Sequence, residues 1–109
     1  MSLRKAADFV ADVELQYQWY AENAGWEVAD RYLAAVAATS ALIEREPKLG
    51  PAVRATDPRL AAWRFFVVSR PFHRHILFYE LIDGDVILRR ALHGYRHLPR
   101  RLLDPPGAD

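Results

Sequence analysis

Cysteine is absent from this 109-residue chain, and long apolar runs are absent as well. Without cysteine the chain has neither a disulfide framework nor a thiolate metal site, which fits a reducing cytosol. No apolar run approaches the ~20 residues that a membrane-spanning helix needs. The first twelve residues, MSLRKAADFVAD, lack the apolar stretch of a secretory signal peptide. We therefore expect a cytoplasmic protein without a membrane partner.

A large net charge is also missing, because the formal net charge at pH 7 is only +1. The charge is nevertheless unevenly spread. Residues 1–63 carry seven basic and nine acidic residues, whereas residues 64–109 carry eight arginines, five acidic residues and all four histidines. This asymmetry indicates either an acidic partner, protein or nucleic acid, or simply a solvated basic surface. Length and the 51% hydrophobic content predict a single domain over residues 1–102, followed by a loose tail over residues 103–109.

The first half of the chain has apolar residues at helical spacing. Asp8 is the expected N-cap of a first helix, and Gly25 is suited to the turn after it. The apolar positions of the two predicted helices are Val10, Val13, Tyr17 and Tyr20, then Trp26, Ala29, Leu33, Val36, Ala37, Ser40 and Ile43. The short connection predicts an antiparallel helical hairpin, with Trp19 and Trp26 in core or hinge packing. The preceding SLRKAA is compatible with an edge strand.

The second half alternates with a period of two. After a loop that contains Pro47, Gly50, Pro51 and Pro58, the stretches AWRFFVVS, FHRHILFYELI and VILRRALH read as strands. Asp-Gly at positions 83–84 predicts a two-residue type I′ hairpin turn. The predicted order is β-α-α-β-β-β, an α+β domain in which the helical hairpin packs on one face of a small, mostly antiparallel sheet.

The turn fixes a pairing in which Ile82 lies opposite Asp85. The face predicted to pack on the helices carries His75, Leu77, Tyr79 and Leu81 opposite Leu92, Arg90, Leu88 and Val86. The open face carries Arg74, Ile76, Phe78 and Glu80 opposite His93, Ala91, Arg89 and Ile87. An apolar centre with a basic rim is typical of a protein-binding surface. The alternative is a second small core covered by the chain's own tail.

Other chemistry has weak support in the residues. His73 and His75 could ligate a metal with His93 or His97, but no carboxylate or fourth ligand accompanies them, and we expect no metal. YRHLPRRLL could contact nucleic acid, although few aromatic residues accompany its arginines. No glycine-rich phosphate loop or Ser/His/Asp order is present. We therefore expect no cofactor and no small-molecule substrate.

Several pieces of the sequence together carry a family resemblance. DVELQYQWYAENAGWEVADRYLAAVAATSALIEREPKLG, LAAWRFFVV and HILFYELIDGDVILRRALHGYRHLPRRL contain YAENAG, P-x-LG, WR, ILFYE and LHGYR in order. From about Ala6 to Leu102 the chain resembles the ParE/RelE toxin superfamily, and most closely the ParE-type plasmid-stabilisation toxins. The resemblance implies a helical hairpin on a small antiparallel sheet, in agreement with the fold predicted from the residues.

The resemblance also implies the toxin of a bacterial type II toxin–antitoxin module, silenced by a cognate antitoxin. ParE-like members inhibit DNA gyrase without cutting RNA, whereas RelE-like members enter the ribosome and cut mRNA. RelE-like nucleases place an arginine at the position that corresponds to Ile76, which favours a non-enzymatic gyrase inhibitor here. The expected antitoxin- or target-binding residues are Arg64, Arg74, Ile76, Phe78, Arg89, Ala91, His93 and Arg96.

Two alternatives remain open at this stage. One is a metal-independent endoribonuclease that acts on the ribosome and mRNA, with His93, Arg74 and Arg96 as its catalytic residues. The other is a decayed toxin that binds its antitoxin and poisons nothing.

Overall fold

A computed structural model describes residues 2–94 and 98–107, and it has the predicted α+β architecture. The elements are β1 (Leu3–Lys5), α1 (Ala7–Asn23), α2 (Trp26–Arg45), a 3₁₀ turn η1 (Pro58–Leu60), β2 (Trp63–Val67), β3 (His75–Ile82), β4 (Asp85–His93) and α3 (Leu98–Leu103). The sheet order is β1-β4-β3-β2, with β1 parallel to β4 and the other pairs antiparallel. No helix in residues 2–94 and 98–107 is long and apolar enough to cross a membrane.

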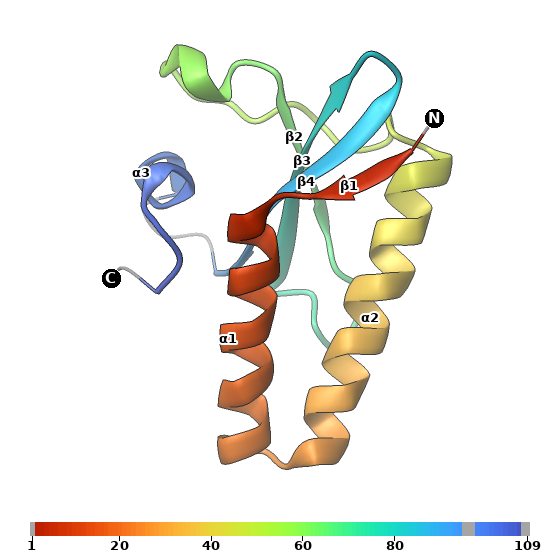
Figure 1. The fold of residues 1–109 in the computed structure, drawn as a ribbon, viewed down its shortest axis with the longest axis vertical. Coiled ribbons are helices and arrows are strands. Elements are labelled where there is room, and N and C mark those ends of the chain that lie inside the picture. Colours follow the sequence, from red (N-terminus) through yellow and green to blue (C-terminus); the bar gives the residue numbers. More distant parts are fainter. Residues whose placement is uncertain (1, 95–97, 108–109) are drawn as a thin grey trace.

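The helices α1 and α2 form the predicted antiparallel hairpin beside the sheet (Figure 1). Gly25 allows the tight connection because its φ of 95° lies in the left-handed region that L side chains rarely adopt. The prediction of Asp8 as N-cap is wrong, since α1 begins at Ala7 and Asp8 lies in its first turn. Ala6 remains extended and donates its N–H to the carbonyl of Leu88, so β1 runs directly into the helix.

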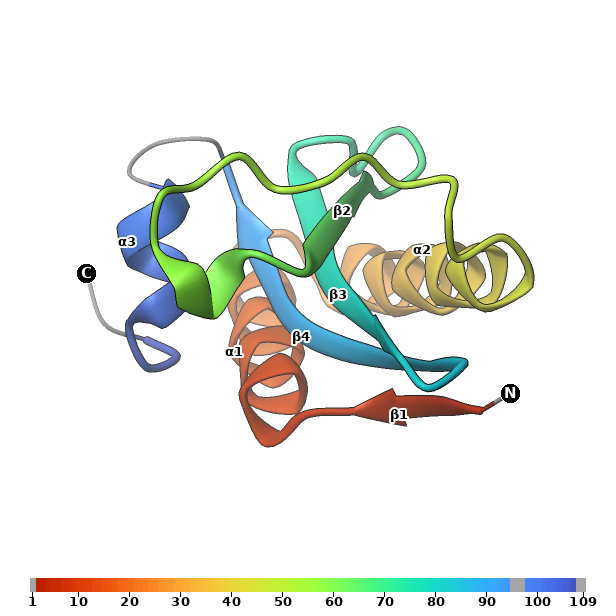
Figure 2. The ribbon, with the colours of Figure 1, turned by 90° about the horizontal axis from the view of Figure 1, so that it is seen from above.

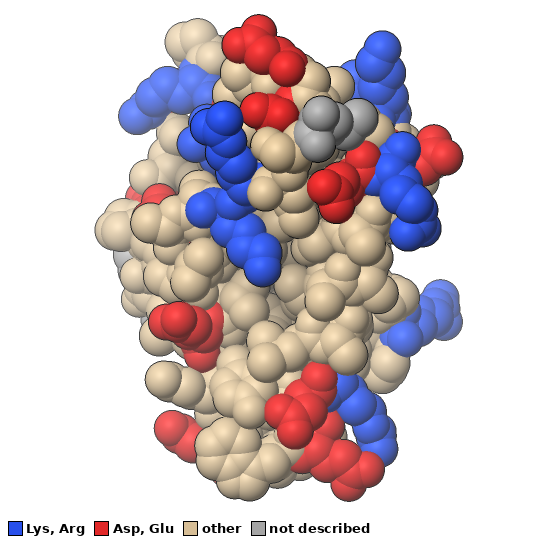
Figure 3. All heavy atoms as spheres, turned by 45° about the vertical axis from the view of Figure 1, so that its right-hand side comes forward, with Lys and Arg blue, Asp and Glu red and all other residues tan. Residues whose placement is uncertain are grey.

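The buried faces of the helices differ from the predicted stripe. Phe9 and Asp12 are the buried residues of α1, while Val10 is 39% exposed. The prediction that the two tryptophans pack in the core is wrong, because Trp19 is 55% and Trp26 67% exposed. The predicted alternative of packing at the hinge is confirmed for Trp26, whose ring centroid lies 5.9 Å from that of Tyr17 across the helical turn, while the ring of Trp19 lies against Tyr20 of its own helix. Figure 3 shows that acidic and basic side chains are interspersed on the α2 side of the molecule.

The main core lies between the hairpin and the sheet. Its buried members are Phe9, Tyr32, Val36, Ile43, Val68, Phe72, Leu77, Tyr79, Val86, Leu88 and Ala91. The predicted inward set on β3 and on the first half of β4 therefore packs on the helices, as alternation of side chains along a strand requires.

A β-bulge changes the second half of the β3–β4 pairing. Asp83 and Gly84 both have positive φ, as a type I′ turn requires, and the predicted partners hold as far as Tyr79 opposite Leu88. The register then shifts by one residue, with Arg89 as the extra residue on β4. Ala91 consequently faces the helices, and its predicted place on the open face is wrong.

The same shift changes the partner of every β3 residue from His75 to Phe78, and it moves Leu92 from the predicted helix-facing side to the face that carries Ile76. Arg74 was predicted opposite His93, but His75 takes that place. Arg90 was predicted opposite Leu77 on the helix-facing side, but it pairs with Phe78. The turn residues determine only the pairs next to the turn, and they do not indicate a bulge several residues away. The prediction therefore continued the same register along the whole hairpin.

The open face of the sheet is not open. Ile76 and Phe78 do lie on the face away from the helices, as predicted, but they are only 1% and 2% exposed. The second small core holds Leu60, Trp63, Ile76, Phe78, Leu92 and Leu102, with Val53, Ala55, Phe65, Leu98 and Leu103 packed around it. The segment that contains η1 and the helix α3 cover this face (Figure 2). The predicted exposed apolar patch is therefore wrong, and the alternative of a second small core is confirmed, although the η1 segment covers this core together with the C-terminal part of the chain.

Candidate functional site

A narrow apolar cavity lies between α3 and the covered face of the sheet. We call it the apolar slot; its volume is about 160 Å³. Its lining consists of Val53, Arg54, Phe65, Ile76, Phe78, Leu98, Pro99 and Leu102. Beside it runs a wider groove, which we call the α3 groove. The α3 groove is lined by Arg54, Ala55, Thr56, Asp57, Pro99, Arg100 and Leu103, so the two share Arg54 and Pro99.

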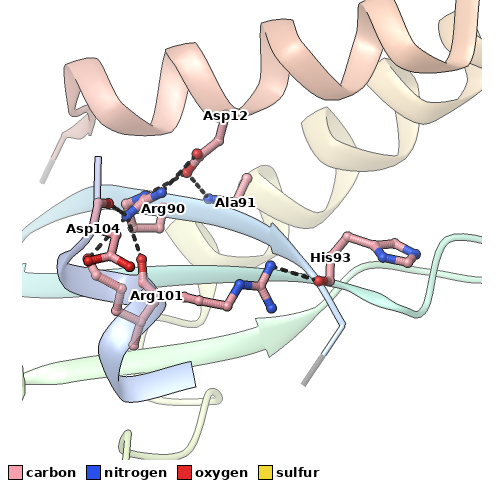
Figure 4. Close-up of polar contacts among 7 residues, drawn as sticks. Asp12, Arg90, Ala91, His93, Arg101 and Asp104 are labelled. Carbon is pink, nitrogen blue, oxygen red and sulfur yellow. Dashed lines mark hydrogen bonds and ion pairs between the residues drawn. The ribbon is translucent and has the colours of Figure 1, made fainter. Parts of the chain in front are cut away.

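The helix α3 is held in place by Arg90, which lies at the bulge of β4 (Figure 4). The guanidinium donates through Nη1 to the backbone carbonyl oxygens of Arg101, Leu102 and Asp104. These carbonyls lie at the C-terminal end of α3, where a helix has no backbone donors of its own to satisfy them. One side chain thus fixes the wall of the apolar slot to the sheet.

Asp12 of α1 holds Arg90 from the other side. Arg90 donates to both carboxylate oxygens of Asp12, from Nε at 2.7 Å and from Nη2 at 3.0 Å. The same carboxylate accepts from the backbone N–H of Ala91 at 3.0 Å. The strand β1 pairs with β4 only as far as Leu88, so it offers no backbone acceptor to the N–H of Ala91. The carboxylate of Asp12 accepts from this N–H in its place. The pair connects α1, β4 and α3, and its two side chains are at most 5% exposed.

The loop after α2 is fixed by two side chains of the sheet. The Tyr79 hydroxyl donates to the carbonyl of Pro47 at 2.7 Å and accepts from the N–H of Gly50. Arg64 donates to the Gly50 carbonyl at 2.7 Å. Arg64, predicted to meet a partner on the open face, therefore binds the P-x-LG loop at the other face. Burial raises the pKa of Tyr79, so the hydroxyl keeps its proton for this bond.

Two histidines and a tyrosine meet near the end of β4. The ring centroids of His75 and His93 are 4.7 Å apart, and the Tyr20 hydroxyl lies 2.7 Å from Nε2 of His75. The prediction that His75 lies away from His93 is wrong, because the bulge makes them cross-strand partners. Burial and, as a smaller contribution, the neighbouring His93 together lower the pKa of His75 to about 4, so the imidazole is neutral at pH 7.

His93 itself is on the surface. It borders a small cavity with Gln16, Trp19 and Tyr20. Partial burial lowers the pKa of His93, and the positive charges of Arg74 and Arg101 lower it further. A neutral imidazole of this kind can accept a proton. Within residues 2–94 and 98–107, no group of three or more histidine, cysteine, aspartate or glutamate side chains could hold a metal ion.

The remaining predicted binding residues are scattered. Arg89 pairs with Glu80 at 3.0 Å, and its side chain is 34% exposed. Arg74 is exposed beside the end of β4. Arg96 lies outside the described residues. A role for Arg64, Arg74, Arg89, His93 and Arg96 in binding stays a prediction, whereas the exposure assumed for Ile76, Phe78 and Ala91 is wrong.

Sequence reasoning did not find Arg54 or Arg100, and it did not find that Asp12 pairs with Arg90. One signal was present for the buried pair. Asp12 follows Phe9 by three residues on a helix face that is otherwise apolar, and Arg90 lies in a strand of apolar residues. Opposite charges on two faces that meet are expected to pair, because a lone buried charge is costly.

The chain was compared with known proteins. Residues 3–98 match the model of the family described as "ParE toxin of type II toxin-antitoxin system, parDE". No curated protein sequence matches the chain significantly. A solved structure from the "Chromosomal ParDE TA system from P. aeruginosa" has the same fold, with a TM-score of 0.71 at 16% identity over 87% of this chain and 97% of that chain. Since the family model spans most of its length, the chain belongs to the ParE toxins of type II toxin–antitoxin systems.

Proposed function

We propose that this chain is a non-nucleolytic toxin that inhibits DNA gyrase and is neutralised by a cognate antitoxin. Membership in the ParE family supports the toxin role. The proposal that the toxin does not cut RNA is supported by the burial of the sheet face on which RelE-like nucleases carry their basic residues. At its centre, Ile76 and Phe78 are only 1% and 2% exposed beneath α3 and the η1 segment.

Cleavage of RNA without a metal needs a general base, a general acid and cations around the phosphate in the transition state. An apolar core beneath a covering helix supplies none of these. A carboxylate does lie on β3 beyond Phe78, but the side chain of this residue, Glu80, is 13% exposed and already paired with Arg89. The carboxylate of Glu80 is therefore directed at Arg89 and not at an open site on the sheet.

A ribosome-dependent ribonuclease is the second candidate. One observation favours it: the surface imidazole of His93 is kept neutral beside Arg74, and this combination can take a proton near a phosphate. A decayed toxin that binds its antitoxin alone is the third, and expression without growth arrest would identify it.

The test is expression of this chain in bacteria with and without the small acidic protein expected from the neighbouring reading frame. Growth arrest that the neighbour relieves, together with intact mRNA in primer extension, is the expected result. Codon-phased cuts in mRNA that vanish in His93→Ala but persist in His73→Ala would overturn the proposal in favour of the ribonuclease. His73→Ala is the matched control, because His73 is an exposed histidine in the loop before β3.

A further inference from the structure

We infer that the apolar slot is an anchor site, which takes one large apolar side chain from an acidic segment of the antitoxin that also lies along the α3 groove. This inference rests on the proposed function and adds where and by which chemistry the partner binds. The binding surface predicted from the sequence was an exposed sheet face, whereas the one inferred here is an opening of the size of a side chain at the edge of the second small core.

The slot has the size and lining for one side chain. A cavity of about 150 Å³ lined by leucine, isoleucine and phenylalanine stays dry and admits benzene. The slot has about 160 Å³ and a similar lining, with Phe65, Ile76 and Leu102 among its walls. A phenylalanine or leucine side chain from a partner therefore fits, whereas water gains little there.

The slot is a gap at the edge of the second small core. Protein interiors are packed to the density of organic crystals, with few voids larger than a water molecule. Leu98, Pro99 and Leu102 come from a helix of six residues, and Val53 comes from a loop. The opposite wall belongs to the sheet. The slot lies where these separately anchored pieces meet, so a partner can enter between them.

The rim of the slot is basic. Arg54 is exposed and lines both the slot and the α3 groove. Arg100 lines the groove with a side chain that is 71% exposed, and its only ion pair in the described residues is a 3.9 Å contact with Asp104. Such a surface pair contributes little. The acidic residue of the rim, Asp57, is already engaged by Arg59 at 2.7 Å. The unsatisfied charge at the rim is positive, and it complements an acidic segment.

Two other occupants fit less well. The chain's own tail runs elsewhere, because Gly107 lies next to Leu15 on α1. A second copy of the chain, docked about a two-fold axis at the same groove, would bring the basic rims of Arg54 and Arg100 together. An acidic protein segment satisfies both the apolar slot and the basic rim.

The experiment measures binding of the purified neighbouring-frame protein to this chain by titration calorimetry. Val53→Phe fills the slot from within and should lower the affinity at least tenfold without lowering the melting temperature. The matched control is Val10→Phe on the exposed face of α1, which should change affinity less than twofold. Affinity unchanged by Val53→Phe in a folded protein would overturn the inference.

A charge test is independent of the filling variant. Reversal of the rim by Arg54→Glu with Arg100→Glu should weaken binding at least tenfold and flatten its dependence on salt. Reversal of Arg70, exposed in the loop between β2 and β3, is the control and should leave both unchanged. Equal effects of rim and control reversals would remove the α3 groove from the interface.

A direct probe covers the case in which Val53→Phe fails to fold. Benzene titrated into the wild-type chain should shift methyl resonances of Ile76 and Leu102 saturably, and absence of such binding would overturn the slot as a preformed site. The two levels of failure are distinct. A wild-type chain that never binds the neighbouring protein refutes the proposed partner and the anchor together, whereas strong binding insensitive to all these substitutions refutes the anchor alone.

Discussion

Removal of the carboxylate of Asp12 should destabilise this protein more than any surface substitution. In Asp12→Ala the guanidinium of Arg90, which is 3% exposed, stays buried without its counter-ion. Breaking a buried pair by deleting one partner costs about 3–5 kcal/mol. The N–H of Ala91 also loses its acceptor. Domains of this size have free energies of unfolding of about 5–15 kcal/mol, so the loss is a large fraction of the total.

The assay is urea unfolding followed by far-ultraviolet circular dichroism. With a slope of about 1.5–2 kcal/mol per molar urea, a loss of this size lowers the unfolding midpoint by about 2 M. Asp8→Ala is the matched control, because Asp8 is an exposed aspartate in the first turn of the same helix. Its loss should cost only about 0.3–1 kcal/mol through the helix dipole.

A double variant separates pairing from packing. Asp12→Leu with Arg90→Met replaces the ions by apolar groups of similar length, and such replacements of buried pairs are often close to neutral. The double variant should regain more than half of the free energy that Asp12→Ala loses, while α3 exchanges its amide hydrogens faster because its carbonyls lose Arg90. A loss below about 1 kcal/mol in Asp12→Ala, or a double variant less stable than the single one, would refute the reasoning.

Three further outcomes follow from the core, the loop and the surface. The pKa of His75 is about 4 in the folded chain and 6.5 in the unfolded chain, so between these pH values the unfolded state binds a proton that the folded state does not. The free energy of unfolding should therefore fall as the pH drops from 6.5 to 4, by at most about 3 kcal/mol. His75→Gln should flatten this dependence of stability on pH, and an unchanged dependence would contradict the reasoning. Gly50→Ala should lower the melting temperature by 10 °C or more, since its Cβ would meet a strand carbonyl and a tyrosine hydroxyl, with an estimated cost of about 2–3 kcal/mol; a shift below about 2 °C would show that the loop gives way. Trp19→Ser and Trp26→Ser should each change the free energy of unfolding by less than about 1 kcal/mol because both rings are mostly exposed; a loss above about 2 kcal/mol would place them in the core.

The sequence was most informative where one local rule decides the structure. Helical spacing before and after Gly25 gave the hairpin, and Asp83-Gly84 gave the β3–β4 turn with its first pairs. The alternation along β3 separated Leu77 from Ile76 and Phe78 correctly. These features depend on residues close together in the chain, so patterns of spacing capture them.

What failed depended on contacts between distant segments. The residues around the bulge at Arg89 are ordinary strand residues, so the sequence does not mark its position. The bulge turns Ala91 and His93 from the predicted open face to the helix-facing side. The cover over the second core comes from residues 53–60 and 98–103, which lie outside the stretches with helical or alternating spacing. The structural role of Asp12 could not be predicted for the same reason, since its partner is an arginine 78 positions away in the chain.

The most direct test of the proposed function is a supercoiling assay with purified DNA gyrase, relaxed plasmid and ATP. This chain should block supercoiling in a dose-dependent manner, and prior mixing with the neighbouring-frame protein should restore it. Full supercoiling at a large molar excess of folded chain would contradict the assignment of gyrase as its target.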